Sequence, residues 1–285
     1  MIPAKFEYAR PDTVAEAVRA LADGGEDAKV IAGGQSLLPL LRLRLAYPDL
    51  LVDVGGIGEL RGVTDAGDAL VIGARTTHYQ LVHDPLVAEH AGLLAQATST
   101  VADPAVRHRG TLGGALAHGD PAGDLPAVIL ALDSTLIAQG PGGEREIAAA
   151  DFFVDYLTTS LEPDEILTAI RIPKLGPGWG YTYEKFHRTA QSWATVGVAA
   201  LVRRDNGSVA EARIGLTNMG TVPVRASAAE QAARGADTTQ AALNEAAAHA
   251  DEGTEPPADL HGAADYRRHL ARVLTGRALA AAAGI

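Results

Sequence analysis

The stretch VIAGGQSLLPLLRLRL, from Val30 to Leu45, sets the organisation expected for the rest of the chain. Its apolar start predicts a buried strand over residues 29–32, and the leucine-rich end predicts a packed helix. Between them, Gly33, Gly34 and Ser36 predict a tight turn that leaves backbone N–H groups free for a phosphate. The same residues also fit a plain turn in which glycine supplies a positive φ and Ser36 caps the helix.

A second glycine pair follows in Arg109-Gly110-Thr111-Leu112-Gly113-Gly114, and AHGDPAGDLP comes directly after it, from Ala117 to Pro126. Two loops of small residues in one domain suit a ligand that carries two phosphates. The second loop therefore favours phosphate binding over the plain turn. A Rossmann fingerprint is not formed, because Arg61 stands where the last glycine of a G-x-G-x-x-G starting at Gly56 would be.

The composition limits the function further. The chain has 285 residues, 47% of them hydrophobic, so it can bury a sizeable core. Its formal net charge of −11 argues against a nucleic-acid partner. It has no cysteine, which excludes thiolate-bound iron–sulfur clusters and a cysteine nucleophile. No apolar run reaches the roughly 20 residues of a membrane span, and the N-terminus lacks a signal sequence, so we expect a cytoplasmic protein.

Other segments predict local structure. Thr13 and Glu16 form a capping-box pair before a helix whose apolar face carries Val14, Ala17, Val18 and Leu21. Strands are expected over 181–186, 193–203 and 209–216, with alanine-rich helices over 239–250 and 264–282. In the last helix, Tyr266, Leu270, Val273 and Leu274 share one face. The 9 histidines, which include His78, His83, His108 and His118, show no metal-ligand spacing and are expected on the surface or in loops.

The motifs together resemble the FAD-binding medium subunits of molybdenum hydroxylases, the family of the carbon monoxide dehydrogenase medium subunit and the xanthine dehydrogenase flavin domain. AGGQS, TLGG and HGDPAGDLPAV are followed by RIP at 171–173 and YEKF at 183–186. Phe6 to Pro11 and Gly215 to Asn218 extend the resemblance over essentially the whole chain. Each motif is weakly specific, whereas their order and spacing are strongly specific.

The resemblance implies an α+β fold of two domains. Residues 1–174 are expected to form a PCMH-type FAD-binding domain of two α/β subdomains. Residues 175–285 are expected to form a C-terminal three-stranded antiparallel sheet with a helical bundle. The boundary lies in Leu175 to Gly180, where glycine and proline crowd between two strand patterns.

The resemblance also implies which residues bind FAD, and it implies no catalytic residue and no metal ligand. Asp124 matches an acid directed at the cofactor's hydroxyls, although it also fits an N-cap for the helix that begins at Leu125. Lys185 matches a lysine near the flavin, although a strand lysine is more commonly in solvent. Trp193 matches an aromatic beside the isoalloxazine, although an aromatic at a strand start is more often in the core. Ala115 stands where the family often has asparagine or serine, so one polar contact is expected to be missing.

The complete predicted set is Val30, Ile31, Ala32, Gly33, Gly34, Gln35, Ser36, Leu37, Thr111, Gly113, Gly114, Ala115, Asp124, Leu167, Lys185 and Trp193.

In this family the resemblance implies an electron-transfer role. FAD collects electrons from [2Fe–2S] clusters of a small subunit, which receives them from a molybdopterin-containing large subunit, and the complex is a dimer of heterotrimers. Two alternatives stay open: a free-standing FAD-dependent oxidase or dehydrogenase for a small organic substrate, and a scaffold protein whose flavin site has decayed. The substrate and the final electron acceptor, whether quinone, NAD or oxygen, are not readable from this chain.

Overall fold

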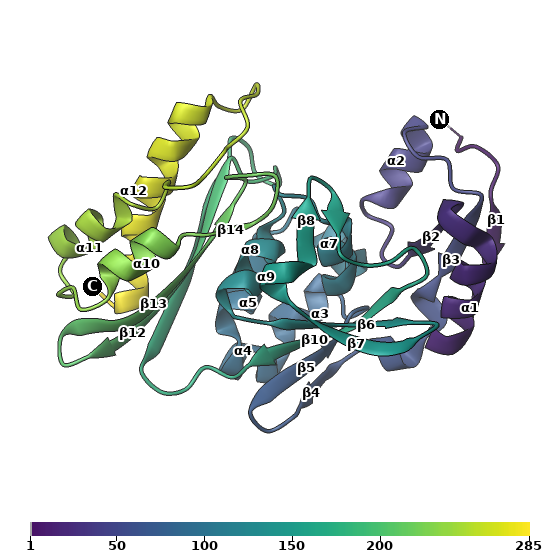
Figure 1. The fold of residues 1–285 in the computed structure, drawn as a ribbon, viewed down its shortest axis with the longest axis horizontal. Coiled ribbons are helices and arrows are strands. Elements are labelled where there is room, and N and C mark those ends of the chain that lie inside the picture. The colour runs from purple at the N-terminus through teal and green to yellow at the C-terminus, as the bar shows by residue number, and fades with distance from the viewer. Residues whose placement is uncertain (1) are drawn as a thin grey trace.

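The computed structural model describes residues 2–285 and has three parts arranged side by side (Figure 1). The first part is a parallel sheet in the order β1-β3-β2, with two helices. Its elements are β1 (Glu7–Ala9), α1 (Val14–Gly24), β2 (Ala28–Ile31), α2 (Leu37–Leu43) and β3 (Leu50–Asp53).

Helix α1 forms as its sequence predicts. The Thr13 side chain accepts a hydrogen bond from the Glu16 N–H, which caps the first turn. The four apolar positions spaced by three and four residues are all buried, namely Val14, Ala17, Val18 and Leu21. The local pattern was sufficient here because the four positions form one face of the helix, which packs on the first sheet and on β10 of the second.

Two expectations for the segment from 29 to 45 are wrong. Strand β2 is at the edge of its sheet rather than buried, and Val30 is 36% exposed. Helix α2 buries only Leu41, while Leu43 is 56% and Leu45 is 68% exposed. Figure 1 shows α2 at the periphery of the molecule, so this short helix has one side on the protein, and Leu38 and Leu43 on its other side are exposed.

The second part is an antiparallel sheet in the order β4-β5-β10-β6-β7, with helices packed on it. Its strands are β4 (Val63–Asp65), β5 (Ala69–Gly73), β6 (Thr135–Gly140), β7 (Gly143–Ala148) and β10 (Ile166–Pro173). Its helices are α3 (His78–His83), α4 (Pro85–His90), α5 (Gly92–Ser99), α6 (Pro104–Arg109), α7 (Leu112–His118), α8 (Asp124–Ala131) and α9 (Ala149–Phe152). A small hairpin of β8 (Phe153–Asp155) and β9 (Thr158–Thr159) lies beside them.

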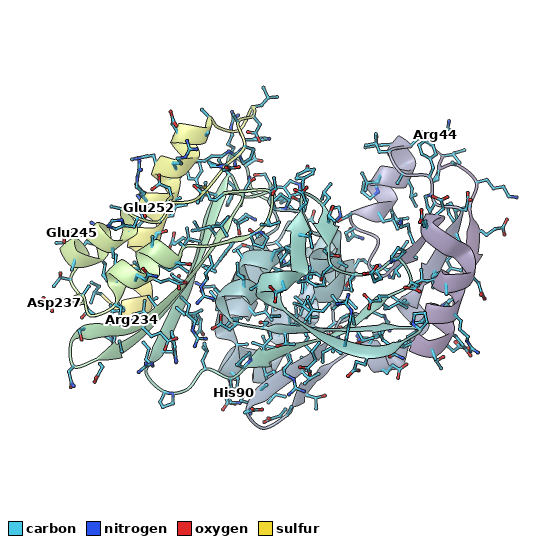
Figure 2. All side chains as sticks on the ribbon, in the orientation of Figure 1. Arg44, His90, Arg234, Asp237, Glu245 and Glu252 are labelled. Atoms are coloured by element: carbon cyan, nitrogen blue, oxygen red, sulfur yellow. The ribbon has the colours of Figure 1, made fainter. Side chains whose placement is uncertain are left out.

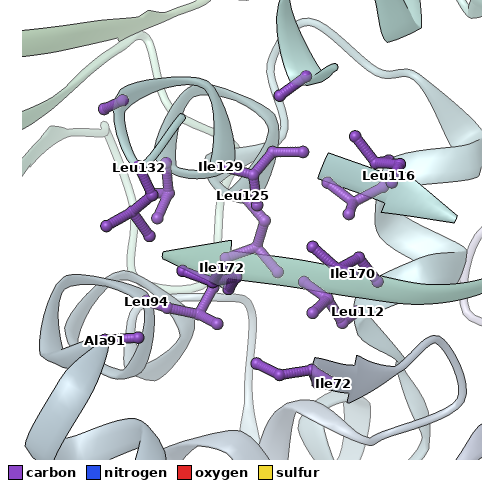
Figure 3. Packing of buried hydrophobic residues seen from close by; sticks show 14 of the residues in the cluster. Ile72, Ala91, Leu94, Leu112, Leu116, Leu125, Ile129, Leu132, Ile170 and Ile172 are labelled. Atoms are coloured by element: carbon purple, nitrogen blue, oxygen red, sulfur yellow. The ribbon is translucent and has the colours of Figure 1, made fainter. Parts of the chain in front are cut away.

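The largest apolar core lies between this sheet and its helices. Figure 3 shows Ile72 and Ile170 of the sheet facing Leu112 and Leu125 of the helices. All four side chains are at most 1% exposed. This core fixes the positions of α7, which contains Gly113 and Gly114, and of α8, which begins at Asp124.

The third part is an antiparallel sheet covered by helices. Its strands, in the order β11-β12-β13-β14, are β11 (Trp179–Phe186), β12 (Val196–Asp205), β13 (Ser208–Thr217) and β14 (Val224–Arg225). Its helices are α10 (Ser227–Ala233), α11 (Gln240–Ala247) and α12 (Ala264–Ala283). The three expected long strands are present, and the structure adds the two-residue β14.

The alanine-rich helices pack their small side chains inward and carry charge outward. Figure 2 shows Arg234, Asp237 and Glu245 pointing away from the body of the protein. In α12 the expected face is partly wrong, because Tyr266 is 43% exposed and the neighbouring Arg267 is completely buried. The guanidinium of Arg267 is held by polar groups, described below, which offsets the cost of burying it.

Both faces of the C-terminal sheet are covered. Val196 and Val198 of β12 pack with the helices that include α12, whereas Ala199 and Leu201, on the opposite face, belong to the same core as α8. The approach to α8 is very close, since a Cβ added at Gly215 would lie 2.2 Å from the Ala127 carbonyl oxygen. One core therefore extends across the predicted boundary at 174/175, and that boundary stays a prediction.

Candidate cofactor-binding site

A cavity of about 690 Å³ is lined by all three parts of the chain. It is of the size that ligand pockets usually have, about 300–1,000 Å³. All sixteen residues predicted from the sequence line it. They come from five separate segments: the end of β2 and the loop to α2, the start of α7, the start of α8, strand β10, and β11 with the loop that follows it. The sequence therefore identified residues that the fold brings to one place.

The first glycine loop offers unused backbone donors. Within residues 2–285, the N–H groups of Gly34, Gln35 and Ser36 have no hydrogen-bond acceptor. Gly34 has φ of 73°, as the plain-turn interpretation required, but the Ser36 side chain makes no capping hydrogen bond. Three consecutive free N–H groups at a cavity wall are an anion-binding arrangement.

The second glycine loop is built differently. The N–H of Gly113 donates to the Ala74 carbonyl at 2.7 Å, and that of Gly114 donates to Thr111 Oγ1 at 3.1 Å. A Cβ added at Gly113 would lie 2.4 Å from the Ala74 Cβ. These glycines let α7 approach the end of β5, so their main contribution is close packing, whereas the free donors belong to the first loop.

The two loops contact each other directly. A Cβ added at Gly33 would lie 2.2 Å from the Arg109 carbonyl oxygen and 2.9 Å from the Gly110 Cα. A side chain at position 33 would therefore push the backbones of the two loops apart. The residues of the two loops that were predicted to bind the diphosphate therefore belong to segments in direct contact.

A buried polar cluster forms the opposite side of the cavity. Lys185 Nζ donates to Asp124 Oδ2 at 2.8 Å and to the Thr100 carbonyl at 3.2 Å, and the Tyr183 hydroxyl donates to Asp124 Oδ1 at 2.6 Å. The side chains of Lys185 and Asp124 are 6% and 4% exposed. The alternatives of a solvent-exposed lysine and an N-capping aspartate are both wrong: Gly123 is the N-cap residue, and the Asp124 carboxylate crosses to β11 instead.

Burial raises the pKa of Asp124, while the nearby Lys185 ammonium lowers it. Burial, together with the Asp124 carboxylate, raises the pKa of the Tyr183 hydroxyl well above its usual value. Tyr183 therefore stays protonated and acts as a donor to Asp124. The cluster joins α8 of the second part to β11 of the third, and it presents a paired lysine rather than a free cation to the cavity.

Trp193 stands in a loop rather than at a strand start, because β12 begins only at Val196. Its side chain is 58% exposed, so the core interpretation is wrong. The loop is anchored from behind: Asn218 Nδ2 donates to the Ala194 carbonyl at 2.8 Å, and the Arg267 guanidinium donates to the Thr195 carbonyl. The anchored loop holds an aromatic surface at the cavity that is open to solvent.

Sequence reasoning missed several residues that line the cavity, among them Arg75, His78 and Asp120. The expectation that His78 is a surface or loop histidine is wrong, since it is 4% exposed and opens α3. The Thr77–Gln80 capping box could have indicated this, because it places His78 in the first turn of a helix. Thr77 also forms an isolated β-bridge with Thr111, which brings that turn next to the second glycine loop.

Among residues 2–285, no group of three or more histidine, aspartate or glutamate side chains is placed to hold a metal ion. In the same part of the chain, no helix combines the length and apolar character needed to cross a bilayer.

Comparison with known proteins gives matches over nearly the whole chain. Residues 4–175 match the model of the FAD-binding domain in molybdopterin dehydrogenase, and residues 181–282 match that of the CO dehydrogenase flavoprotein C-terminal domain. The chain is 42% identical to the carbon monoxide dehydrogenase medium chain of Hydrogenophaga pseudoflava, covering 99% of this chain and 98% of that one.

Two other relatives have different substrates in their names. The chain is 37% identical to the 6-hydroxypseudooxynicotine dehydrogenase complex subunit alpha of Paenarthrobacter nicotinovorans, covering 99% of this chain and 96% of that one. It superimposes on a chain of quinoline 2-oxidoreductase from Pseudomonas putida 86 with a TM-score of 0.95 and 36% identity, covering 100% of this chain and 99% of that one.

Proposed function

The chain belongs to the family of FAD-binding subunits of molybdenum hydroxylases, and on that premise we propose that it is the electron-transfer subunit of such a complex. It is an oxidoreductase subunit whose family binds FAD. The finer proposal is that it receives electrons from [2Fe–2S] clusters of a partner subunit and passes them to an external acceptor. The observation that carries the proposal is the single cavity in which all sixteen predicted residues meet.

The residues of the cavity fit FAD. The free N–H groups of Gly34, Gln35 and Ser36 would bind the diphosphate, and the close contact at Gly33 keeps that part of the wall free of side chains. Asp124 and Lys185 would bind polar groups at the other end, and Trp193 would cover the ring system. When bound there, FAD supplies the redox chemistry, since it accepts and donates electrons. The protein's part is binding, orientation and control of access.

The partners follow from the same proposal. The chain has no cysteine, so clusters bound by thiolates would have to belong to another chain. We place the chain with a molybdopterin-containing large subunit and a [2Fe–2S] small subunit, as a dimer of heterotrimers in the cytoplasm. Relatives at 36–42% identity carry names with unlike substrates, which supports substrate selection outside this chain.

The test compares two glycine variants that both place a side chain at positive φ; at Gly34 the added Cβ would also lie 2.8 Å from Cδ1 of the exposed Leu38 side chain. Gly34 and Gly67 both have positive φ, 73° and 87°, but only Gly34 lines the cavity. The parent, Gly34→Ala and Gly67→Ala are incubated with FAD and desalted, and their visible spectra are recorded. We expect flavin absorption in the parent and in Gly67→Ala and a strong loss in Gly34→Ala. Equal retention in both variants would contradict the role of the first loop.

The electron-transfer role needs a second experiment. The FAD-loaded chain is mixed with the co-purifying cluster-bearing subunits, and flavin bleaching is followed after the substrate of the complex is added. Bleaching that depends on the partner supports the proposal. Turnover of a small substrate by the chain alone would establish the free-standing enzyme instead, and a parent that stays colourless with FAD and partners present would establish the decayed site.

A further inference from the structure

His78 is a buried titratable residue whose side chain makes no hydrogen bond within residues 2–285. It lines the cavity, and its side chain is almost completely buried. Its Nδ1 atom is buried and has no hydrogen-bond partner within residues 2–285. Because Nδ1 is enclosed by the protein, only the other ring nitrogen, Nε2, which makes no hydrogen bond within residues 2–285, can donate to a ligand in the cavity.

The other edge of the ring lies where the two glycine loops meet. A Cβ added at Gly110 would lie 2.8 Å from His78 Cδ2 and 3.0 Å from His78 Nε2. The His78 N–H also donates to the Gly110 carbonyl at 2.9 Å, which fixes the start of α3 against the second loop. Gly110 is the residue against which Gly33 packs, so Nε2 is placed next to the predicted diphosphate site.

The protonation state of the ring follows from its surroundings. Burial, with a smaller contribution from the Arg107 guanidinium, lowers the pKa of His78 to about 4. At neutral pH the ring is therefore neutral and carries one proton. A buried N–H without an acceptor is less well tolerated than an unused lone pair, which favours Nδ1 as the bare nitrogen and Nε2 as the N–H.

An arginine lies on the same segment as His78. Arg75 is three residues before His78 and lines the same cavity, with its guanidinium donating to the Ile57 carbonyl at 3.0 Å. Burial lowers the pKa of Arg75, repulsion from Arg61 and Arg109 lowers it further, and the Asp53 carboxylate opposes this change. Arg75 therefore adds a cation to the wall of the cavity on the segment that carries His78.

We propose that His78 is a binding residue for the cofactor's diphosphate, to which its Nε2–H donates a hydrogen bond at the junction of the two glycine loops. The inference rests on the proposed function and adds a third segment, 75–78, to the two loops. It gives the site one neutral side-chain donor beside the backbone donors of the first loop.

The test compares ligands that do and do not carry a diphosphate. His78→Leu keeps an apolar side chain of similar size but has no donor, whereas His78→Gln can place an amide N–H near the position of Nε2. Dissociation constants are measured for FAD, ADP and riboflavin with the full chain. We expect His78→Leu to bind FAD and ADP roughly ten- to hundredfold more weakly and riboflavin unchanged, with His78→Gln close to the parent.

Several outcomes would overturn the inference. Unchanged binding of FAD and ADP by His78→Leu would do so, and so would equal weakening of all three ligands, which indicates general loosening. If the parent itself bound no FAD, the proposed function would fail rather than this inference alone.

A measurement on the parent covers the case in which the variants do not fold. The imidazole nitrogens are observed by NMR in protein with isotope-labelled histidine, before and after addition of ADP or riboflavin. We expect the Nε2–H resonance of the buried neutral histidine to shift with ADP and not with riboflavin. An unchanged resonance on saturation with ADP would overturn the inference.

Discussion

Removal of the Lys185 ammonium should lower the free energy of unfolding, because it breaks the buried ion pair with Asp124. In Lys185→Met the side-chain volume is kept and the charge is lost. Asp124 then remains only 4% exposed, with the Tyr183 hydroxyl as its remaining side-chain donor. Breaking a buried ion pair by removing one partner costs about 3–5 kcal/mol. A loss of that size is a large part of the roughly 5–15 kcal/mol by which domains are stable.

The loss should depend on pH in a defined direction. Burial raises the pKa of Asp124, and Lys185 opposes that rise, so the variant's Asp124 has a still higher pKa. An acid whose folded-state pKa is raised favours the folded state below its unfolded pKa, and this contribution is lost as the pH rises through the folded pKa. The deficit of Lys185→Met should therefore be largest near neutral pH and shrink as the pH falls and Asp124 takes up a proton.

The assay is urea unfolding of the cofactor-free chain at several pH values, followed by circular dichroism. The double variant Asp124→Asn/Lys185→Met removes both charges and should recover most of the loss. Lys174→Met is the control, because Lys174 pairs with the half-exposed Asp65 at 2.6 Å and its loss should change little. A deficit of Lys185→Met below about 1 kcal/mol near neutral pH, or one that grows on acidification, would refute the reasoning.

Three other variants test separate features. Gly33→Ala should lower the melting temperature and weaken FAD retention, because its Cβ would lie 2.2 Å from the Arg109 carbonyl oxygen. Gly58→Ala is the control: its Cβ would meet nothing within 4 Å, so it should match the parent in both measurements. Glu165→Gln should lower the free energy of unfolding by about 0.5–1 kcal/mol near neutral pH and leave it unchanged in strong acid. The hydrogen bond from Arg145 lowers the pKa of Glu165, and the stabilisation that this gives is lost as the pH falls through the lowered pKa. Equal urea midpoints of parent and variant at neutral pH would count against it. Arg267→Met should loosen the anchored tryptophan loop and raise the quenching of tryptophan fluorescence by acrylamide, and unchanged quenching would show that the guanidinium does not hold the loop.

The sequence predicted elements whose stability is local. Helix α1 was predicted residue by residue, because a capping pair and a 3.6-residue period are properties of the segment itself. The glycine loops were predicted for a similar reason, since few residues other than glycine permit such close backbone contact. The sixteen site residues came from the resemblance, and the structure brings them to one cavity.

Burial was predicted less well, because it depends on what lies opposite in the fold. The leucines of α2 were expected in the core, yet Leu43 is exposed, since that helix has only one neighbouring surface. His78 was expected at the surface, yet it is enclosed by the second loop, which follows it by some thirty residues in the printed sequence. Lys185 was expected near the flavin or, as the alternative, in solvent, and its pairing with Asp124 was not predicted because Asp124 comes from a helix of another part of the fold.

The two-sided burial of the C-terminal sheet has a consequence for how this protein can evolve. Strand β12 places Ala199 and Leu201 in one core and Val196 and Val198 in another. A substitution in α8 and a substitution in α12 therefore both change the packing of this strand. Recombination near residue 175 would join α8 to a foreign sheet, and only a glycine or an equally small residue at position 215 would accept the Ala127 carbonyl. The two halves are therefore expected to be inherited as one unit, and compensating changes should occur in pairs across the sheet.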